Sequence, residues 1–221
     1  MSLKSFIREC CASASPSAAL QRLDQTIQVK PQEGCLMSKH NARAMPKAVI
    51  FDLDGTLVSS SLDFRAICHE TGCVPGQDIL RYMETLSASE KAKVAKVIHD
   101  HEMADAHSCE TLSGAIEMLA MLDNLNIRTA IVTRNSAPAT QIKLARTGIK
   151  LKHVLTREDA APKPAPDALL GLARQWGIPS ESCVYVGDYI YDLEAAHRAN
   201  MHACLYLSLI HISEPTRRTP I

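Results

Sequence analysis

The chain has 221 residues, of which 46% are hydrophobic and 22% are charged, with 24 Lys and Arg against 24 Asp and Glu. These values are typical of a globular protein with one domain plus an insert, or with two small domains, so a wholly disordered chain is excluded. The lack of a basic excess argues against a dedicated nucleic-acid-binding protein. No apolar run in the sequence approaches the roughly 18 residues that a membrane-spanning helix requires.

The two ends of the sequence differ in character from the middle. Residues 1–45 show no sustained strand or helix period and carry few acidic residues, which predicts a disordered extension or a mitochondrial or plastid transit peptide. An upstream reading frame before a natural start at Met45 is the alternative. Residues 207–221 resemble the translated adapter of a sequencing library, so we interpret them as an artefact tail that follows Tyr206. The expected location is the cytoplasm, or an organelle if residues 1–45 are a transit peptide.

The cysteines indicate a reducing compartment. None of the eight shows a Cys-x-x-Cys spacing or a Cys/His ligand spacing, so we expect single free thiols and no zinc site built from them.

Short apolar runs alternate with helical patterns from residue 48 onward. Five runs predict strands: 48–51, 129–132, 153–155, 183–186 and 202–206. A helix is expected from Ser136 as its N-cap to Arg146, with Gly148 just beyond its end. Because the strands are apolar on both faces and helices follow them, we predict an α/β fold with a doubly wound, mostly parallel sheet.

One long segment interrupts this alternation. Residues 59–108 contain no strand signal, and three helices are predicted there, at 63–70, 77–86 and 89–107. An insert at this point lies above the carboxyl ends of the strands, where α/β proteins bind ligands. We therefore expect a small all-helical cap at 59–108, on a catalytic core made of residues 46–58 and 109–206.

Two carboxylates end the first predicted strand. Asp52 and Asp54 are two residues apart in an extended segment, so their side chains point the same way. Such carboxylates repel each other unless a shared proton or a cation relieves them, and Mg²⁺ is the oxygen-liganded ion expected there. A plain turn at Asp54-Gly55 is the alternative explanation.

Further polar residues follow the later strands. Thr133 closes the second strand, Lys163 lies between two prolines ahead of a helix, and Asp188 and Asp192 follow the fourth strand. Each alone has an ordinary structural explanation, as a strand-end hydroxyl, a solvated lysine or an acidic first helical turn. All of them in this order point to one site.

Together these four motifs resemble the haloacid dehalogenase superfamily, in particular its phosphatase branch, over residues 47–206. The helical insert looks like the cap of the phosphoglycolate-phosphatase-like members, and the resemblance implies a Rossmann-like core. It also implies that Asp52 is the nucleophile that forms an aspartyl-phosphate, and that Asp54 is the general acid and base. Thr133 would hydrogen-bond a phosphoryl oxygen, and Lys163 would offset negative charge.

The resemblance also implies a Mg²⁺ site. Asp52, Asp188 and the backbone carbonyl of Asp54 would hold the ion, and Asp192 would hold a water on it or bind Lys163. We expect strict Mg²⁺ dependence and inhibition by Ca²⁺, which takes more ligands at longer distances. The start of the helix near Ser136 would add backbone donors beside the anion.

The expected function is Mg²⁺-dependent hydrolysis of a small phosphomonoester. The resemblance also implies that Asp54 and Asp188 argue against carbon–halogen chemistry, because the dehalogenases of the superfamily lack an acid two residues after the nucleophile and need no metal. By the same comparison, Thr56 favours a phosphatase over a phosphomutase. The alternatives are a phosphomutase and a non-catalytic binding or regulatory module on this fold. The expected partners are a small-molecule phosphate ester and no nucleic acid or membrane, in a monomer or homodimer.

The predicted cap offers four candidates for contact with the leaving group, namely Arg65, His69, Arg81 and His99. A solvated helix face is the alternative for each of them, and it is the favoured explanation. The spacing of His99, His101 and His107 does not suit a metal site, and a pair such as His101 and Asp105 supplies too few ligands for zinc.

Overall fold

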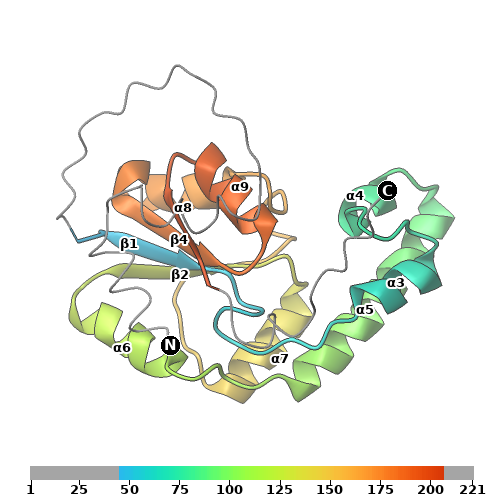
Figure 1. Cartoon of the computed structure of the whole chain (residues 1–221), viewed down its shortest axis with the longest axis horizontal. Helices are drawn as coiled ribbons and strands as arrows, with labels where there is room; N and C mark the ends of the chain where they lie inside the picture. Colours follow the sequence, from blue (N-terminus) through green and yellow to red (C-terminus); the bar gives the residue numbers. More distant parts are fainter. Residues whose placement is uncertain (1–44, 207–221) are drawn as a thin grey trace, which may run out of the picture.

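A computed structural model describes residues 45–206 of the chain. The predicted extension, apart from Met45, and the predicted tail at 207–221 lie outside the described residues. Within the described part, strands and helices alternate, and a helical segment separates the first two strands (Figure 1).

The centre of the fold is a five-stranded parallel sheet. Its strands are β1 (Ala48–Phe51), β2 (Arg128–Val132), β3 (Val154–Leu155), β4 (Cys183–Gly187) and β5 (His202–Leu205). They lie in the order β3-β2-β1-β4-β5, and every neighbouring pair is parallel. The predicted doubly wound α/β fold is confirmed, and the predicted strands differ from the observed ones only at their ends.

Helices cover both faces of the sheet. These helices are α6 (Ala115–Asn124), α7 (Ala137–Thr147), α8 (Asp167–Trp176) and α9 (Ile190–Arg198), and a 3₁₀ turn (Ser180–Ser182) precedes β4. In Figure 1, α6 and α7 lie on one side of the sheet, and α8 and α9 on the other. Val49 and Phe51 pack into the first core layer, while Ala48 and Ile50 pack into the second. Burial on both faces explains why β1 is apolar at every position.

Three helices form the segment between β1 and β2. They are α3 (Phe64–Thr71), α4 (Ile79–Glu84) and α5 (Ala88–Ser108), and they share a small apolar core of their own. The sequence predicted three helices here, and their starts differ by one or two residues: α3 and α4 begin later because a capping residue precedes each, whereas α5 begins one residue earlier than predicted. Asp63 and Asp78 accept hydrogen bonds from the first helical N–H groups, and Ser87 forms a capping box with Glu90.

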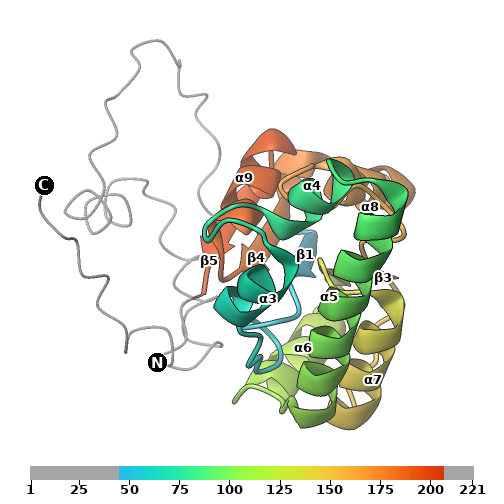
Figure 2. The ribbon, with the colours of Figure 1, turned by 90° about the vertical axis from the view of Figure 1, so that its right-hand side faces the viewer.

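The helical segment is joined to the sheet by two adjacent stretches of chain. The Ser59 N–H donates to the Glu110 carbonyl at 2.8 Å, and the Glu110 N–H donates to the Ser59 hydroxyl at 2.9 Å. From there α5 runs alongside α7 (Figure 2). The two connections of the three helices thus lie side by side in space, and α5 packs against α7.

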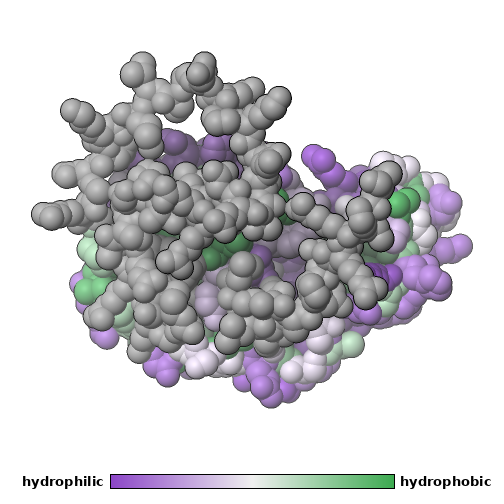
Figure 3. Space-filling model, in the orientation of Figure 1, coloured by the Kyte–Doolittle hydropathy of each residue, from purple (hydrophilic) through white to green (hydrophobic). Residues whose placement is uncertain are grey.

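The surface of this segment combines polar residues with a few exposed apolar ones, such as Phe64 and Val74. In Figure 3, the end of the molecule formed by α3, α4 and α5 shows mainly hydrophilic residues on the visible face. None of the helices within 45–206 is long and apolar enough to cross a bilayer. Lys93 and Lys96 of α5 are exposed to solvent.

The described cysteines are free thiols. Cys68, Cys73, Cys109, Cys183 and Cys204 are all buried and form no disulfide, as expected for these five. The other three cysteines lie outside the described residues.

Candidate active site

Parallel strands bring the predicted site residues to one edge of the sheet. The segments that follow β1, β2, β3 and β4 supply them: Asp52, Asp54, Thr133, Lys163, Asp188 and Asp192. Because β1 lies between β2 and β4, their carboxyl ends meet at the position where α/β folds bind ligands. The Thr133 hydroxyl is buried and accepts a hydrogen bond from the Asn135 N–H at 3.2 Å.

Lys163 binds two of the aspartates. Its Nζ lies 2.7 Å from Asp52 Oδ1 and 2.7 Å from Asp192 Oδ1, and all three side chains are nearly inaccessible to solvent. The expected contact between Asp192 and Lys163 is therefore present. A buried ammonium group requires such partners, since an isolated buried charge is very costly.

Two residues of β4 shape the surroundings of Asp192. The Tyr185 hydroxyl lies 3.1 Å from Asp192 Oδ1, and the Tyr185 ring centre lies 5.5 Å from the Lys163 ammonium group. A Cβ at Gly187 would lie 2.3 Å from Asp192 Cγ, so only glycine leaves room for this carboxylate. Strand β4 thus supports the carboxylate on which Lys163 rests.

Burial and neighbouring charges shift the pKa values of this cluster in opposite directions. Burial raises the pKa of Asp52 to about 8, although the Lys163 ammonium group opposes the rise. Burial lowers the pKa of Lys163, but the Asp52 and Asp192 carboxylates outweigh it, so the pKa is raised overall. The lysine is charged at neutral pH, and the nucleophile candidate Asp52 depends on nearby positive charge to ionise.

The carboxylates of Asp52, Asp188 and Asp192 can place their oxygens within 4.8 Å of one another. This all-oxygen donor set suits a hard divalent cation such as Mg²⁺. Gly55 keeps the space open, because a Cβ there would lie 2.0 Å from Asp188 Oδ2. The side chain of Asp54 is not part of this group, since it binds other residues.

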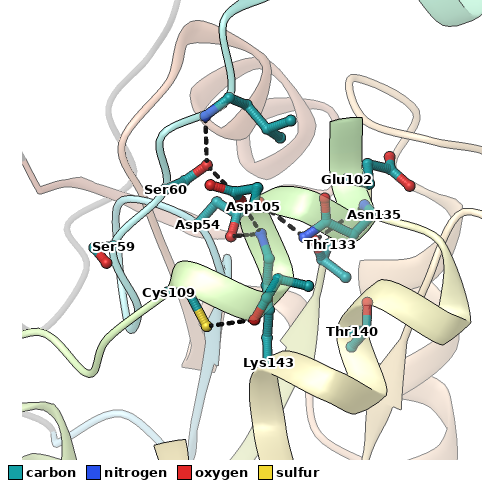
Figure 4. A network of polar contacts seen from close by, with 12 residues as sticks. Asp54, Ser59, Ser60, Glu102, Asp105, Cys109, Thr133, Asn135, Thr140 and Lys143 are labelled. Carbon is teal, nitrogen blue, oxygen red and sulfur yellow. Dashed lines mark hydrogen bonds and ion pairs between the residues drawn. The ribbon is translucent and has the colours of Figure 1, made fainter. Parts of the chain in front are cut away.

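Asp54 instead belongs to a second lysine cluster (Figure 4). Lys143 of α7 is fully buried, and its Nζ lies 2.6 Å from Asp54 Oδ1 and 2.6 Å from Asp105 Oδ2. The other Asp54 oxygen accepts a hydrogen bond from Asn135 Nδ2 at 2.8 Å. Burial raises the pKa of Asp54, and the Lys143 and Asn135 contacts oppose the rise. The sequence predicted neither Lys143 nor Asp105 as part of the site.

The start of α7 differs from the expected anion site. Ser136 is the N-cap as predicted, although its hydroxyl makes no capping hydrogen bond. Its N–H donates to Glu102 Oε2 at 3.3 Å, and the Ala137 N–H donates to Glu158 Oε2 at 3.0 Å. Glu102 also pairs with Arg157. The expectation of free backbone donors was wrong for these two groups, because carboxylates from other segments already occupy them.

Another ion pair connects α4 to the loop after β2. Arg134 Nη2 lies 2.6 Å from Asp78 Oδ1, and Arg134 Nη1 lies 3.1 Å from Asp78 Oδ2. The guanidinium also contacts the Lys163 carbonyl and lies 4.7 Å from the centre of the Tyr191 ring. This pair holds α4 next to the loop that carries Lys163. The sequence contained no signal for it, because the partners are 56 residues apart.

We expect the Asp78→Asn variant to lose about 1 kcal/mol of unfolding free energy at pH 7. Asparagine keeps the capping acceptor of α4, so the change reports the ion pair. Burial favours a higher pKa for Asp78, but Arg134 and the α4 N–H groups lower it below the ordinary 3.8. The stabilisation is therefore present above that value and is lost as pH falls through the lowered pKa.

Urea unfolding of both proteins across this range measures the effect. The difference in unfolding free energy between wild type and Asp78→Asn should disappear as the solution is acidified below about pH 4. Asp100→Asn, which removes an exposed pair with Lys96, is the control and should show little difference at any pH. A difference for Asp78→Asn that is independent of pH would contradict the electrostatic explanation.

The cap candidates from the sequence lie on exposed helix faces. Arg65, His69, Arg81 and His99 are all solvent-exposed, and no contact of theirs with the six site residues is among the described interactions. His101 binds Glu70 at 3.0 Å, whereas Asp105 binds Lys143. His101 and Asp105 therefore bind different partners, although they lie on one face of α5.

The fold and the site define a parallel α/β protein with an acidic, lysine-bridged centre at the carboxyl ends of its strands. Over residues 49–206 the chain matches the haloacid dehalogenase-like hydrolase family, and it belongs to that family. The expected family and the expected enzyme class, a hydrolase, are confirmed.

Individual relatives agree with this assignment. The chain is 30% identical over 177 residues to a haloacid dehalogenase-like hydrolase domain-containing protein of Arabidopsis thaliana, covering 75% of this chain and 72% of the relative. It is 29% identical over 178 residues to a phosphoglycolate phosphatase of Xanthomonas campestris, covering 71% and 80%. The crystal structure of a hydrolase from Pseudomonas syringae is similar, with a TM-score of 0.60 and 26% identity, covering 71% of this chain and 83% of that chain.

Proposed function

We propose that this hydrolase is a Mg²⁺-dependent phosphatase that cleaves a small phosphomonoester through an aspartyl-phosphate on Asp52. The observation that carries the proposal is the Lys163 ammonium group, held between Asp52 and Asp192 beside the Asp188 carboxylate. Phosphoryl transfer requires an aligned nucleophile and positive charge around the phosphoryl oxygens. Similarity to a phosphatase supports the same substrate class.

The proposed reaction has two displacements at phosphorus. A carboxylate oxygen of Asp52 attacks, the bond to the ester oxygen breaks, and Asp54 gives its proton to that leaving oxygen. Asp54 then accepts a proton from water, the water oxygen attacks the phosphoryl group, and Asp52 is released with inorganic phosphate. The Thr133 hydroxyl and the Lys163 ammonium group donate hydrogen bonds to the phosphoryl oxygens throughout.

The donor set fits Mg²⁺. Asp52, Asp188 and Asp192 would hold the ion, together with the backbone carbonyl of Asp54. When bound, the ion would offset the negative charge of these carboxylates and of the phosphate dianion. Without it, a dianionic substrate meets a site in which the acidic side chains outnumber the two lysines.

We expect Gly55→Ala to weaken Mg²⁺ binding by about tenfold or more. A Cβ at this position displaces the Asp188 carboxylate. Gly148→Ala is a matched control, because Gly148 has nearly the same positive φ (68° against 69°) and open space around it. Both variants lose about 1–2 kcal/mol of stability from backbone strain. The rise in melting temperature on adding Mg²⁺ should persist in Gly148→Ala and shrink in Gly55→Ala, and equal rises would contradict the proposed site.

The division into parts follows from the same proposal. Residues 46–58 and 109–206 form the catalytic core, and residues 59–108 form a cap over the site. The two adjacent connections at Ser59 and Glu110 support this boundary, as does the separate apolar core of the three helices. A cap in this place would exclude bulk water and select the leaving group.

The proposal extends to the setting of the enzyme. We infer a small-molecule phosphate ester as its partner, with no nucleic acid and no membrane, in a monomer or a homodimer. The proposed location is the cytoplasm. A mitochondrial or plastid location depends on residues 1–45, of which only Met45 is described.

Phosphate release from a panel of esters tests the function. Purified protein is assayed with Mg²⁺ on phosphoglycolate, sugar phosphates, nucleotides and p-nitrophenyl phosphate. We expect Mg²⁺-dependent release, fastest from one small ester. Formation of a phosphorylated isomer that a bisphosphate activates would instead identify a phosphomutase. No turnover by folded, Mg²⁺-binding protein would favour a non-catalytic module.

A further inference from the structure

Lys143 is a buried cation that the proposed mechanism does not use. Its side chain is fully inaccessible to solvent, and it lies between the carboxylates of Asp54 and Asp105 (Figure 4). Lysine is almost never fully buried unless it is paired. Here both partners are 2.6 Å away, and one of them is the proposed general acid.

Both oxygens of Asp54 are engaged. Oδ1 accepts a hydrogen bond from Lys143 of α7, and Oδ2 accepts one from Asn135 in the loop that precedes α7. Two donors on the two oxygens define the plane of the carboxylate. The side chain is nevertheless 21% exposed, so it remains accessible from the site.

Lys143 is itself held by a carboxylate with several donors. Asp105 Oδ1 accepts hydrogen bonds from the Ser61 N–H at 2.5 Å and the Ser61 hydroxyl at 3.0 Å. Asp105 Oδ2 accepts one from the Ser60 hydroxyl at 3.0 Å. Asp105 comes from α5, whereas Ser60 and Ser61 belong to the connection that leads into α3. The contacts form one chain from the helical segment to Asp54.

We propose that Lys143 is a positioning residue for Asp54, and that Asp105 holds it in place when α5 packs on α7. This inference rests on the proposed function, because it gives Lys143 a task only if Asp54 protonates the leaving oxygen. Lys143 orients the carboxylate so that it reaches that oxygen, and it makes no contact with the Asp52 and Lys163 cluster among the described interactions.

Such a role has a specific kinetic signature. A general acid must lie within hydrogen-bond reach of the oxygen that it protonates, and it contributes about 10²–10⁴-fold when the leaving group is basic. A p-nitrophenolate leaving group needs little protonation. Loss of the orientation of Asp54 therefore slows cleavage of alkyl esters and spares p-nitrophenyl phosphate.

The test compares kcat/KM for two substrates in the full-length protein with Mg²⁺. The substrates are p-nitrophenyl phosphate and the most rapidly cleaved sugar or alkyl phosphate of the panel. This parameter covers only the steps up to departure of the leaving group, so the later attack by water does not enter. Lys143→Met removes the charge from a side chain of similar shape. We expect it to lower kcat/KM for the alkyl ester by about 10²-fold and for p-nitrophenyl phosphate by less than about threefold.

Companion variants separate positioning from damage to the fold. Lys96→Met removes an exposed lysine of α5 and should change neither rate. Leu172→Ala weakens the core beneath α8, away from this chain of contacts, and should affect both substrates alike if at all. Lys143→Met combined with Asp54→Asn should show no further selective loss, because the group being positioned is already removed.

Asp105→Asn keeps the inference testable if Lys143→Met does not fold. Asparagine still accepts hydrogen bonds, and Lys143 remains paired with Asp54. We expect a selective loss of about tenfold for the alkyl ester. Equal losses on both substrates, or none, would overturn the role of Asp105.

The controls distinguish failure of the inference from failure of the proposed function. Absence of selective loss in Asp54→Asn would refute the acid role of Asp54, and the inference with it. A selective loss in Asp54→Asn together with equal losses in Lys143→Met would overturn the positioning role alone. Selective losses in both, without additivity, would establish it.

Discussion

Replacing Asp52 with asparagine should lower kcat for phosphate release by about 10⁴-fold or more. The amide occupies nearly the same space but cannot form the aspartyl-phosphate. Lys163 still has Asp192 as its partner, so the geometry around the missing nucleophile is retained. The loss should appear with every ester that the wild-type enzyme cleaves, because all share the attacking group.

The same change should not destabilise the fold. Burial raises the pKa of Asp52 to about 8, well above its ordinary 3.8, so folding disfavours the ionised carboxylate between these values. The neutral amide removes that cost at pH 7. In EDTA, which excludes any contribution from bound metal, the melting temperature of Asp52→Asn should be no lower than that of wild type.

Two controls support the interpretation of this loss of activity. Asp100→Asn is the same chemical change at an exposed ion pair of α5, and it should keep full activity. Mass spectrometry excludes deamidation of the new asparagine back to aspartate. Turnover above about one per cent in an intact Asp52→Asn sample would contradict a nucleophilic role for Asp52.

Removing divalent cations should lower turnover by about 10³-fold or more, and Mg²⁺ should restore it. The reason is the charge of the site, where two buried lysines are each shared between two carboxylates and Asp188 adds another. A phosphate dianion meets net repulsion there unless a cation is present. Ca²⁺ should bind but fail to support turnover, because it takes longer bonds and more ligands.

Binding can be followed separately from turnover. Mg²⁺ at about 100 times its dissociation constant should stabilise the folded protein by about 2.7 kcal/mol. Asp188→Asn should lose most of this effect, whereas Asp100→Asn should keep it. Full activity in EDTA-treated protein that has been verified to be free of divalent metal would show that the cation is not required.

Local sequence patterns predicted the sheet because its strands are buried on both faces. Strand β1 is apolar at all four positions, and β4 ends at a glycine that the nearby Asp192 carboxylate requires. The predicted helix boundaries were less exact where a capping residue precedes the helix, as Asp78 precedes α4. The site residues followed from the strand ends, since parallel strands bring those ends together.

The second lysine cluster could not be predicted in this way. Lys143 and Asp105 are 38 residues apart, and their contact depends on how α5 packs against α7. One signal was available, because Lys143 lies four residues after Ala139 and thus on the buried face of its helix. A lysine on a buried helix face indicates a buried carboxylate, but the spacing of charges does not say which one.

Trapping the phosphorylated enzyme tests the central claim most directly. The enzyme is mixed with its best ester and Mg²⁺, quenched in acid during turnover, digested and analysed by mass spectrometry. We expect the mass of one phosphoryl group on the peptide that contains Asp52, and none in Asp52→Asn. Asp54→Asn should accumulate more of the phosphorylated enzyme if this change slows the attack by water more than it slows the first step. Sustained turnover with no phosphoryl group on Asp52, or with the group on another residue, would contradict the account.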